Sequence, residues 1–380
     1  MRFQTITQSF LSIALTLSLV AASAQCQNSQ SGSLKPAAEP LTILVLGDSI
    51  MWGLGLRSEN KSWHQIEVWL AQHTGRPVIE RIEAHSGAVV EADSREASNG
   101  SVDGEVNVAR PSIVDQLERA LRYYVNGREI DLVLVSGCVN DLGARYVLNA
   151  ANATEEIRLL TEAKCGPPME KLLRRITSSF PSAYVIVTGY YPFVSEKTRN
   201  DVFMRGLTKR FYKAIPGAAT LSQEVMFKRM VANSDQWYRS SNKGLDQAVK
   251  NVSAELSRRN AHGRVMFAEI HLGPEHSFRA RKTQLWNFES SPLRKLMAIL
   301  SFGRILLRTN DETRKQRAAS CKEFWKAPPN ETPSQKKERK NEELLCRYAA
   351  LGHPNREGAL IYAEAIVEQL KTRFPVLRPK

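Results

Sequence analysis

Short runs of consecutive apolar residues recur along the chain, and several of them end at a glycine. A run without polar alternation, such as TILVLG, is typical of a strand that is buried on both faces of a sheet. Segments with helical spacing separate these runs. The sequence predicts strands at 42–47, 77–87, 131–137, 183–191 and 264–270, and helices at 66–75, 113–127, 169–180 and 354–374. This alternation predicts an α/β fold with a mostly parallel five-stranded sheet.

Two stretches interrupt this alternation. Residues 196–262 have mainly helical spacing and no convincing strand, and residues 271–349 form a basic insertion before the last helix. Between positions 271 and 340 the chain holds 16 Lys and Arg against 7 Asp and Glu. Within the insertion, 293–308 predicts a helix that packs on the domain by its apolar face, or that lies on a membrane surface or over a substrate. Residues 328–343 predict a solvated loop.

The N-terminus has the features of a signal peptide. Arg2 gives a positive start, an apolar run follows, and Ala22-Ser23-Ala24 has the small-x-small form of a cleavage site. The alternative is a lipoprotein lipidated at Cys26, which Gln25 disfavours because it is large for that signal. We therefore expect export from the cytoplasm, to the periplasm or the medium. The expected organisation is a signal peptide at 1–24, a tether at 25–40 and one domain at 41–380.

Composition narrows the class of protein further. Of 380 residues, 42% are hydrophobic and 24% are charged, which excludes a wholly disordered chain, a collagen-like repeat and a multi-span membrane protein. The net charge of +14 favours acidic partners, namely anionic polysaccharide, lipid headgroups or nucleic acid. A basic surface without a specific partner explains the charge equally well. Peripheral contact with a membrane stays open, and no feature predicts a protein partner.

The chain has five cysteines and no CxxC pair, which argues against a zinc ribbon or a thioredoxin-like motif. In an oxidising compartment the thiols are expected to pair. Their order along the chain suggests Cys138–Cys165 and Cys321–Cys346, with Cys26 free, although connectivity does not follow from sequence.

Candidate chemistry gathers where the predicted strands end. Ser49 follows Gly47-Asp48 at the end of the first strand, Gly87 closes the second, and Asn140-Asp141 follow the third. His353 stands directly before the proline that starts the last helix. Ligand sites of open α/β sheets lie at the carboxyl ends of strands. Each residue alone is explained by a helix cap, a turn or a structural histidine. P-loop, HExxH and GxSxG motifs are absent.

In their order and placement these residues resemble the SGNH hydrolases, also called the GDSL esterase/lipase family. The name-giving motif stands here as Gly47-Asp48-Ser49-Ile50, and the late motif stands as Gly352-His353-Pro354-Asn355. The resemblance covers most of 41–192 and 346–374. It implies a flavodoxin-like three-layer α/β/α fold, Ser49 as nucleophile and His353 as general base. The Ser49 and Gly87 N–H groups and the Asn140 side chain would form the oxyanion hole. Asp48 and Asp141 would support it, without a metal or cofactor.

Two positions depart from the family pattern. The third block is usually Gly-x-Asn-Asp, but Cys138 stands two positions before Asn140, which leaves the placement of that side chain open. The triad carboxylate usually stands three positions before the histidine, where this chain has Ala350. Three alternatives follow: a Ser–His dyad, a backbone carbonyl that orients the ring, or an acid from elsewhere, with Glu342 and Glu343 nearest in sequence. A dyad predicts a lower pKa for His353 than a carboxylate-backed histidine has.

Three functions are compatible with this sequence. The leading one is an extracytoplasmic carboxylic ester hydrolase that works through an acyl-enzyme on Ser49, with acetylated carbohydrate, lipid ester or thioester as substrate. The second is an O-acyltransferase that uses the same acyl-enzyme. The third is a catalytically weak protein that binds polysaccharide or lipid, which Ala350 supports. Binding of nucleic acid ranks last, because the basic excess sits in one insertion without a recognition motif.

Overall fold

A computed structural model describes most of the expected domain. The described residues are 39–91, 104–106, 112–124, 127, 129–201, 204–205, 221–259, 264–289 and 308–373. The expected signal peptide, nearly all of the tether and all but the last residue of the helix expected at 293–308 lie outside them.

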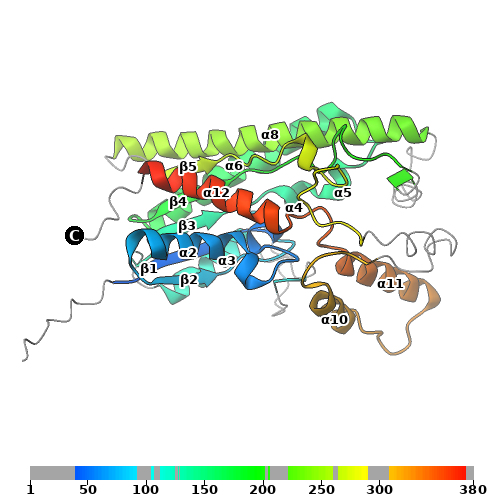
Figure 1. Ribbon diagram of the computed structural model, residues 1–380, viewed down its shortest axis with the longest axis horizontal. Helices are drawn as coiled ribbons and strands as arrows, with labels where there is room; N and C mark the ends of the chain where they lie inside the picture. Colours follow the sequence, from blue (N-terminus) through cyan, green and yellow to red (C-terminus); the bar gives the residue numbers. More distant parts are fainter. Residues whose placement is uncertain are drawn as a thin grey trace, which may run out of the picture. The chain divides into compact units, whose positions relative to one another are not determined.

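A five-stranded sheet forms the centre of the domain (Figure 1). Its strands are β1 Leu41–Leu46, β2 Val78–Ile82, β3 Leu132–Val135, β4 Tyr184–Thr188 and β5 Val265–Ala268. They are all parallel, in the order β2-β1-β3-β4-β5. This is the flavodoxin-like strand order, in which ligands bind where the order reverses, between β1 and β3. The predicted fold class is confirmed, and a strand lies at each of the five predicted places, but β2 ends at Ile82 rather than at Gly87.

Burial explains the composition of the strands. The central strands β1 and β3 are buried on both faces and contain almost only Val, Leu and Ile. The strand β2 lies at the edge of the sheet, and accordingly it carries Glu80 and Arg81 and leaves Ile79 half exposed.

Helices cover both faces of the sheet (Figure 1). The helices α2 and α12 pack on each other on one face, whereas α3, α6 and α8 belong to the other. A pair of short helices, α10 and α11, lies beyond the carboxyl ends of the strands. The α-helix bounds are α1 Ser49–Trp52, α2 Ser62–Thr74, α3 Ile113–Tyr123, α4 Val139–Leu142, α5 Ala144–Val147, α6 Thr154–Ser179, α8 Gln223–Arg258, α10 Arg314–Phe324, α11 Pro333–Arg347 and α12 Arg356–Arg373. Two 3₁₀ turns span Ser58–Asn60 and Pro274–His276.

Three sequence-based expectations need correction. The helix expected to end at Gly127 ends at Tyr123 instead. The helix expected at 169–180 begins fifteen residues earlier and continues through Pro167 and Pro168. Close packing against α8 holds α6 in place where the prolines interrupt its hydrogen bonds, because Gly166 lies directly against Gly244.

The solvated loop expected at 328–343 is also wrong, because α11 occupies most of it. Its start is a capping box, in which the Thr332 and Gln335 side chains each accept from the other residue's backbone N–H. Pro333 takes the first helical position, where a missing N–H costs nothing. A highly polar composition hid this helix, since it packs on little besides α10.

Both expected disulfides are confirmed. Cys138–Cys165 joins the start of α4 to α6, and Cys321–Cys346 joins α10 to α11. Within the part of the chain that the structure describes, no helix combines the length and apolarity needed to cross a membrane.

Candidate active site

The turn after β1 brings the two expected reactive side chains together. Ser49 is the first residue of α1 and is 5% exposed. Its Oγ lies 2.7 Å from Nε2 of His353, which stands 304 residues later in the sequence. The geometry therefore allows Ser49 to donate its proton to a neutral imidazole.

Gly47 gives this turn its shape. Its φ is +143°, and a Cβ at this position would lie 2.6 Å from Ser136 Oγ, so only glycine fits. The buried Gln116 of α3 holds Gly47 from the other side. Gln116 Oε1 accepts from the Gly47 N–H at 2.7 Å, and its Nε2 donates to the Gly47 carbonyl at 2.9 Å. Sequence reasoning missed Gln116, because nothing local marks one polar residue on a helix as a clamp.

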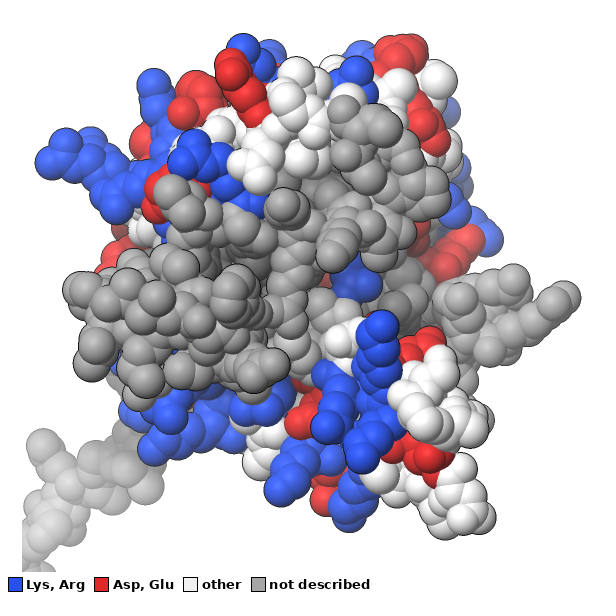
Figure 2. Space-filling view, turned by 90° about the vertical axis from the view of Figure 1, so that its right-hand side faces the viewer, with Lys and Arg blue, Asp and Glu red and all other residues white. Residues whose placement is uncertain are grey.

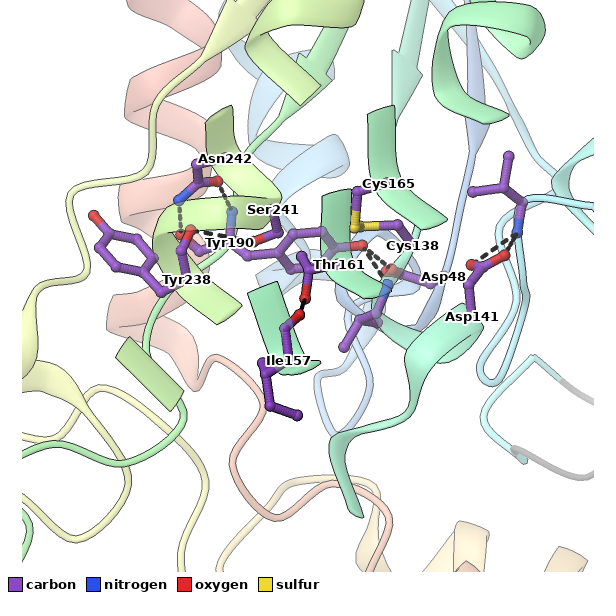
Figure 3. The surroundings of a disulfide bond; sticks show 12 residues. Asp48, Cys138, Asp141, Ile157, Thr161, Cys165, Tyr190, Tyr238, Ser241 and Asn242 are labelled. Carbon is purple, nitrogen blue, oxygen red and sulfur yellow. Dashed lines mark hydrogen bonds between the residues drawn. A yellow bond between two sulfur atoms is a disulfide. The ribbon is translucent and has the colours of Figure 1, made fainter. Parts of the chain in front are cut away.

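Asp48 fixes the direction of α1 rather than serving as a base. Its carboxylate accepts from the Ile50 N–H at 2.9 Å and from the Ser136 hydroxyl at 2.8 Å. It also accepts from the Tyr190 hydroxyl at 2.6 Å (Figure 3). The side chain is fully buried, and burial raises its pKa despite these hydrogen bonds. Asp48 thus holds the ends of β1, β3 and β4 together. Tyr190 and Ser136 were not anticipated from the sequence.

The expected oxyanion donors belong to segments that hydrogen bonds connect. The His85 N–H donates to the Gly47 carbonyl at 2.9 Å, which ties the chain after β2 to the serine turn. Two residues later, Gly87 has a φ of +84°. Among the described residues, neither the Ser49 nor the Gly87 N–H donates to a protein acceptor. Asn140 Nδ2 donates to the Ala88 carbonyl at 2.9 Å, which leaves its second N–H available.

Asp141 holds the same loop. Both of its carboxylate oxygens lie 3.1 Å from the Val90 nitrogen, whose N–H they accept (Figure 3). Burial raises the pKa of Asp141 to about 6, and the hydrogen bond from Val90 opposes this rise. Asp141 therefore supports the loop that carries Gly87.

Cys138 takes the position where the family pattern has glycine. Its φ is +112°, a left-handed conformation that residues with a side chain rarely adopt. The disulfide to Cys165 anchors it on α6, and the next N–H, that of Val139, donates to the Tyr190 hydroxyl at 3.3 Å (Figure 3). The departure noted in the sequence therefore keeps the backbone shape and adds a covalent anchor beside Asn140.

His353 is held differently from a triad histidine. Its Nδ1 is buried and has no hydrogen-bond partner among the described residues. The backbone groups of Ala350 and Leu351 face the ring and raise its pKa, but neither forms a hydrogen bond of normal geometry with Nδ1. Glu342 and Glu343 are the two acids that precede His353 most closely in sequence, and of these Glu343 pairs with Arg339 and Arg347 instead.

Burial and the positive charge of Arg317 together lower the pKa of His353 to about 4, whereas Asp311 acts in the opposite direction. The backbone of the histidine loop is nevertheless well fixed. The Tyr191 hydroxyl donates to the Gly352 carbonyl at 2.9 Å. The backbone N–H of Trp286 donates to the His353 carbonyl at 2.7 Å, and its backbone carbonyl accepts from the Gly352 N–H at 3.0 Å.

Ala350 itself lies in an apolar cluster and is not exposed. The cluster consists of Leu54, Leu56, Trp286, Ala350 and Ala359. A triad carboxylate at position 350 would therefore enter an apolar cluster. Trp286 Nε1 in this cluster has no hydrogen-bond partner among the described residues.

Comparisons with known proteins give a family match. The sequence model described as the GDSL-like Lipase/Acylhydrolase family matches residues 45–273. Comparison with curated proteins by sequence gives no match.

Solved structures with a related fold include two lipolytic enzymes and an acetylesterase. An extracellular lipase from Streptomyces rimosus is 17% identical, with a TM-score of 0.39 over 64% of this chain and 87% of that one. Phospholipase A1 from Streptomyces albidoflavus is 15% identical, with a TM-score of 0.37 over 66% and 89%. A carbohydrate acetylesterase family member from Sinorhizobium meliloti is 16% identical, with a TM-score of 0.32 over 60% and 82%.

The family match covers more than half of the chain, and it includes the serine turn, the loop after β2 and the loop after β3. His353 lies beyond the matched residues, yet the fold places it against Ser49. The chain belongs to the GDSL-like lipase/acylhydrolase family and is an SGNH-type ester hydrolase.

Proposed function

We propose that this protein hydrolyses O-acyl esters outside the cytoplasm, with Ser49 as nucleophile and His353 as general base. The observation that carries the proposal is the 2.7 Å contact between Ser49 Oγ and His353 Nε2 at the carboxyl edge of the sheet. A protein that only binds its ligand has no need for this contact, nor for the Ser49 and Gly87 N–H groups, which donate to no acceptor among the described residues.

The reaction follows from the positions of these groups. Nε2 of His353 takes the Ser49 proton while Oγ attacks the ester carbonyl. The carbonyl oxygen becomes an oxyanion, which the Ser49 and Gly87 N–H groups and the Asn140 amide stabilise. The imidazolium then gives its proton to the departing alcohol, and an acyl-enzyme forms. Water attacks the acyl-enzyme in the same way, with His353 again taking and returning the proton, and the free acid leaves.

The tautomer of His353 is set by this contact. Nε2 has to accept from Ser49, so Nδ1 carries the proton, and this N–H has no acceptor among the described residues. With a pKa lowered to about 4, the ring is neutral at any pH above about 5 and stays competent as a base. We expect kcat/KM to keep its neutral-pH value well into the acidic range.

The alcohol side of the substrate is proposed to be an envelope or extracellular carbohydrate or lipid, and preferably an anionic one. The insertion supports this preference, because exposed lysines gather on α10 and α11 (Figure 2). They are Lys315 and Lys322 on α10, Lys326 just after it, and Lys336, Lys337 and Lys340 on α11. The expected signal peptide and the two disulfides fit an oxidising compartment.

Labelling with a fluorophosphonate tests the nucleophile before any substrate is known. We expect the wild type to be labelled and Ser49→Ala to be silent. His353→Ala should react far more slowly, since nucleophile and base act as a unit and their loss costs about 10⁶-fold in a serine protease. Wild-type turnover of p-nitrophenyl acetate by Ser49→Ala would overturn the assignment of Ser49 as nucleophile. A wild type that is neither labelled nor active would leave a binding protein as the alternative.

The preference for anionic substrates has its own test. The triple variant of Lys336, Lys337 and Lys340 to Gln should bind polygalacturonate more weakly than the wild type, with a shallower salt dependence. Its control changes three exposed lysines on α8, Lys228, Lys243 and Lys250, to Gln and removes the same charge. Equal loss in both variants would mean that only net charge matters, and the proposed surface would be wrong.

A further inference from the structure

A buried arginine of the insertion joins the two halves of the active site. Arg317 lies in α10 and is fully buried. Its Nη1 donates to Glu105 Oε1 at 2.7 Å, and its Nη2 donates to Asp311 Oδ2 at 2.6 Å. Its Nε donates to the Arg347 carbonyl at 3.3 Å. Burying a cation costs free energy of desolvation even when three acceptors surround it, so Arg317 is not an ordinary surface residue.

The first contact leads to the serine. Besides Arg317, the Glu105 carboxylate accepts from the Gly55 N–H and from Trp52 Nε1, both at 3.1 Å. Trp52 is the last residue of α1, the helix that Ser49 begins. The carbonyl of Gly104 accepts from the Ser86 N–H at 3.0 Å, one position before Gly87. Glu105 and its neighbour therefore hold both the serine helix and the oxyanion loop.

The contact between Arg317 Nε and the Arg347 carbonyl leads to the histidine. Arg347 is the last residue of α11, and the chain runs from it through a series of turns to His353. These turns are closed by backbone hydrogen bonds, the last from the His353 N–H to the Ala350 carbonyl at 3.0 Å. Beside Arg317, the Glu312 N–H donates to the Gly55 carbonyl at 2.9 Å. The same few residues of the insertion thus touch both the segment after Ser49 and the segment before His353.

We propose that Arg317 is a positioning residue, which sets the distance between Ser49 and His353 in place of the absent triad carboxylate. The inference rests on the proposed function, because it assumes that Ser49 and His353 react. In a triad, a carboxylate bonded to Nδ1 orients the ring. Here Nδ1 of the ring has no such bond to any described residue, and the backbone that carries the ring is fixed through the guanidinium instead. The basic insertion is on this view part of the catalytic scaffold.

Arg317 also acts on His353 through its charge. The groups that influence the ring are the Arg317 guanidinium, the Asp311 carboxylate and the backbone groups of Ala350 and Leu351. Arg317 lowers the pKa of His353 and Asp311 raises it. Removing the guanidinium while leaving Asp311 should therefore raise the pKa, and the acidic limb of kcat/KM should move to higher pH. A residue that merely stabilised the fold would not move this limb.

The experiment compares three variants at Arg317 with one control, using p-nitrophenyl acetate across the pH range. Arg317→Lys keeps the charge but cannot reach all three acceptors. We expect it to lower kcat by about 10²-fold, the scale of a misplacement of about 1 Å, while leaving the acidic limb in place. Arg317→Met should show the same loss and an upward shift of the limb.

A third variant guards against misfolding. Arg317→Met removes the guanidinium that faces the buried Glu105 and Asp311 carboxylates, so it is repeated with Glu105→Gln and Asp311→Asn, which removes these two negative charges as well. Arg339→Met is the matched control, because Arg339 pairs with Glu331 at 2.6 Å and donates to the Trp325 carbonyl at 2.8 Å in the same helix pair. It should keep the wild-type kcat and pH profile.

Each outcome decides between the alternatives. If the Arg317 variants are folded and lose no more activity than Arg339→Met, Arg317 has no positioning role. If both methionine variants fail to fold, Arg317→Lys decides, and wild-type kcat in that variant overturns the proposal. Ser49→Ala is measured beside them. Activity in Ser49→Ala means that the proposed function is wrong, whereas an inactive Ser49→Ala with unaffected Arg317 variants refutes this inference alone.

Discussion

The serine half of the site (residues 47–49, 87–90 and 136–141) and the histidine half (residues 350–354) are built in different ways. In the serine half, buried side chains hydrogen-bond the reactive turn directly, as Asp48 and Gln116 do. In the histidine half, backbone hydrogen bonds and the Tyr191 hydroxyl fix the loop, and no described side chain bonds Nδ1 of the ring.

This contrast follows from what supports each half. The serine half sits on the ends of three parallel strands, which the core of the domain holds rigid. The histidine half follows a polar helix pair that shares little of that core. Where a sheet supplies rigidity, side chains can be used for fine placement. Where it does not, a buried ion cluster and backbone turns take over that task.

The largest expected effect breaks the serine half. Asp48→Ala leaves the Tyr190 and Ser136 hydroxyls and the Ile50 N–H without their acceptor, and it should lower the free energy of unfolding by about 3–5 kcal/mol. Urea unfolding measures this, and fluorophosphonate labelling should slow in parallel. Asp48→Asn keeps the shape and one acceptor oxygen and should lose much less. Equal losses in the two variants would show that charge, not hydrogen bonding, holds the turn.

The two disulfides close loops of similar length, so their removal allows the two halves to be compared at a similar entropic cost in the unfolded chain. Their cysteines are 27 and 25 residues apart, so removing either should cost a similar amount, about 3–4 kcal/mol. Cys138→Gly with Cys165→Ala loosens Asn140, and kcat should fall toward the loss of about 10²-fold known for one oxyanion donor. Cys321→Ala with Cys346→Ala should affect kcat less. The reverse ranking would contradict the assignment of Asn140 to the oxyanion hole.

A carboxylate at position 350, where the family has its triad acid, tests how the histidine half works without one. Ala350→Asp should leave activity unchanged or raise it, and it should move the acidic limb upward by about one pH unit, because a nearby negative charge favours the imidazolium. The melting temperature should fall, since the carboxylate enters an apolar cluster. Ala350→Asn has the same size without the charge, so it should lower the melting temperature but leave the limb in place. A limb that moves equally in both variants would exclude the electrostatic explanation.

The smallest expected effect concerns Asp141. Burial raises its pKa from 3.8 to about 6, so between these values the folded protein binds a proton that the unfolded chain lacks. Its contribution therefore makes stability fall as pH rises through this window. Asp141→Asn removes that slope while its side-chain oxygen still accepts from Val90. Thermal unfolding at pH 4 and pH 7 should show a smaller difference in the variant, and an unchanged difference would assign the slope to other groups.

The sequence by itself determined the sheet and the candidate reactive residues. Apolar runs of four to six residues specify buried strands locally, and the residues at their ends follow from chain order alone. Gly47, Ser49, Gly87 and Asn140 could be found in this way because each stands beside a strand that is visible in the sequence. The order of the cysteines suggested the pairing that the structure confirms, although the connectivity itself does not follow from sequence.

Only the tertiary structure showed what holds these residues in place. Gln116, Tyr190 and Arg317 act across 69, 142 and 212 positions of sequence on Gly47, Asp48 and Glu105, respectively. A side chain that completes a site through such a contact looks locally like any other polar residue of a helix or strand. The polar helix α11 was hidden for a related reason, since a helix that buries little has no apolar period to reveal it. Local patterns record burial, whereas the pairing of distant polar groups is decided when the chain packs.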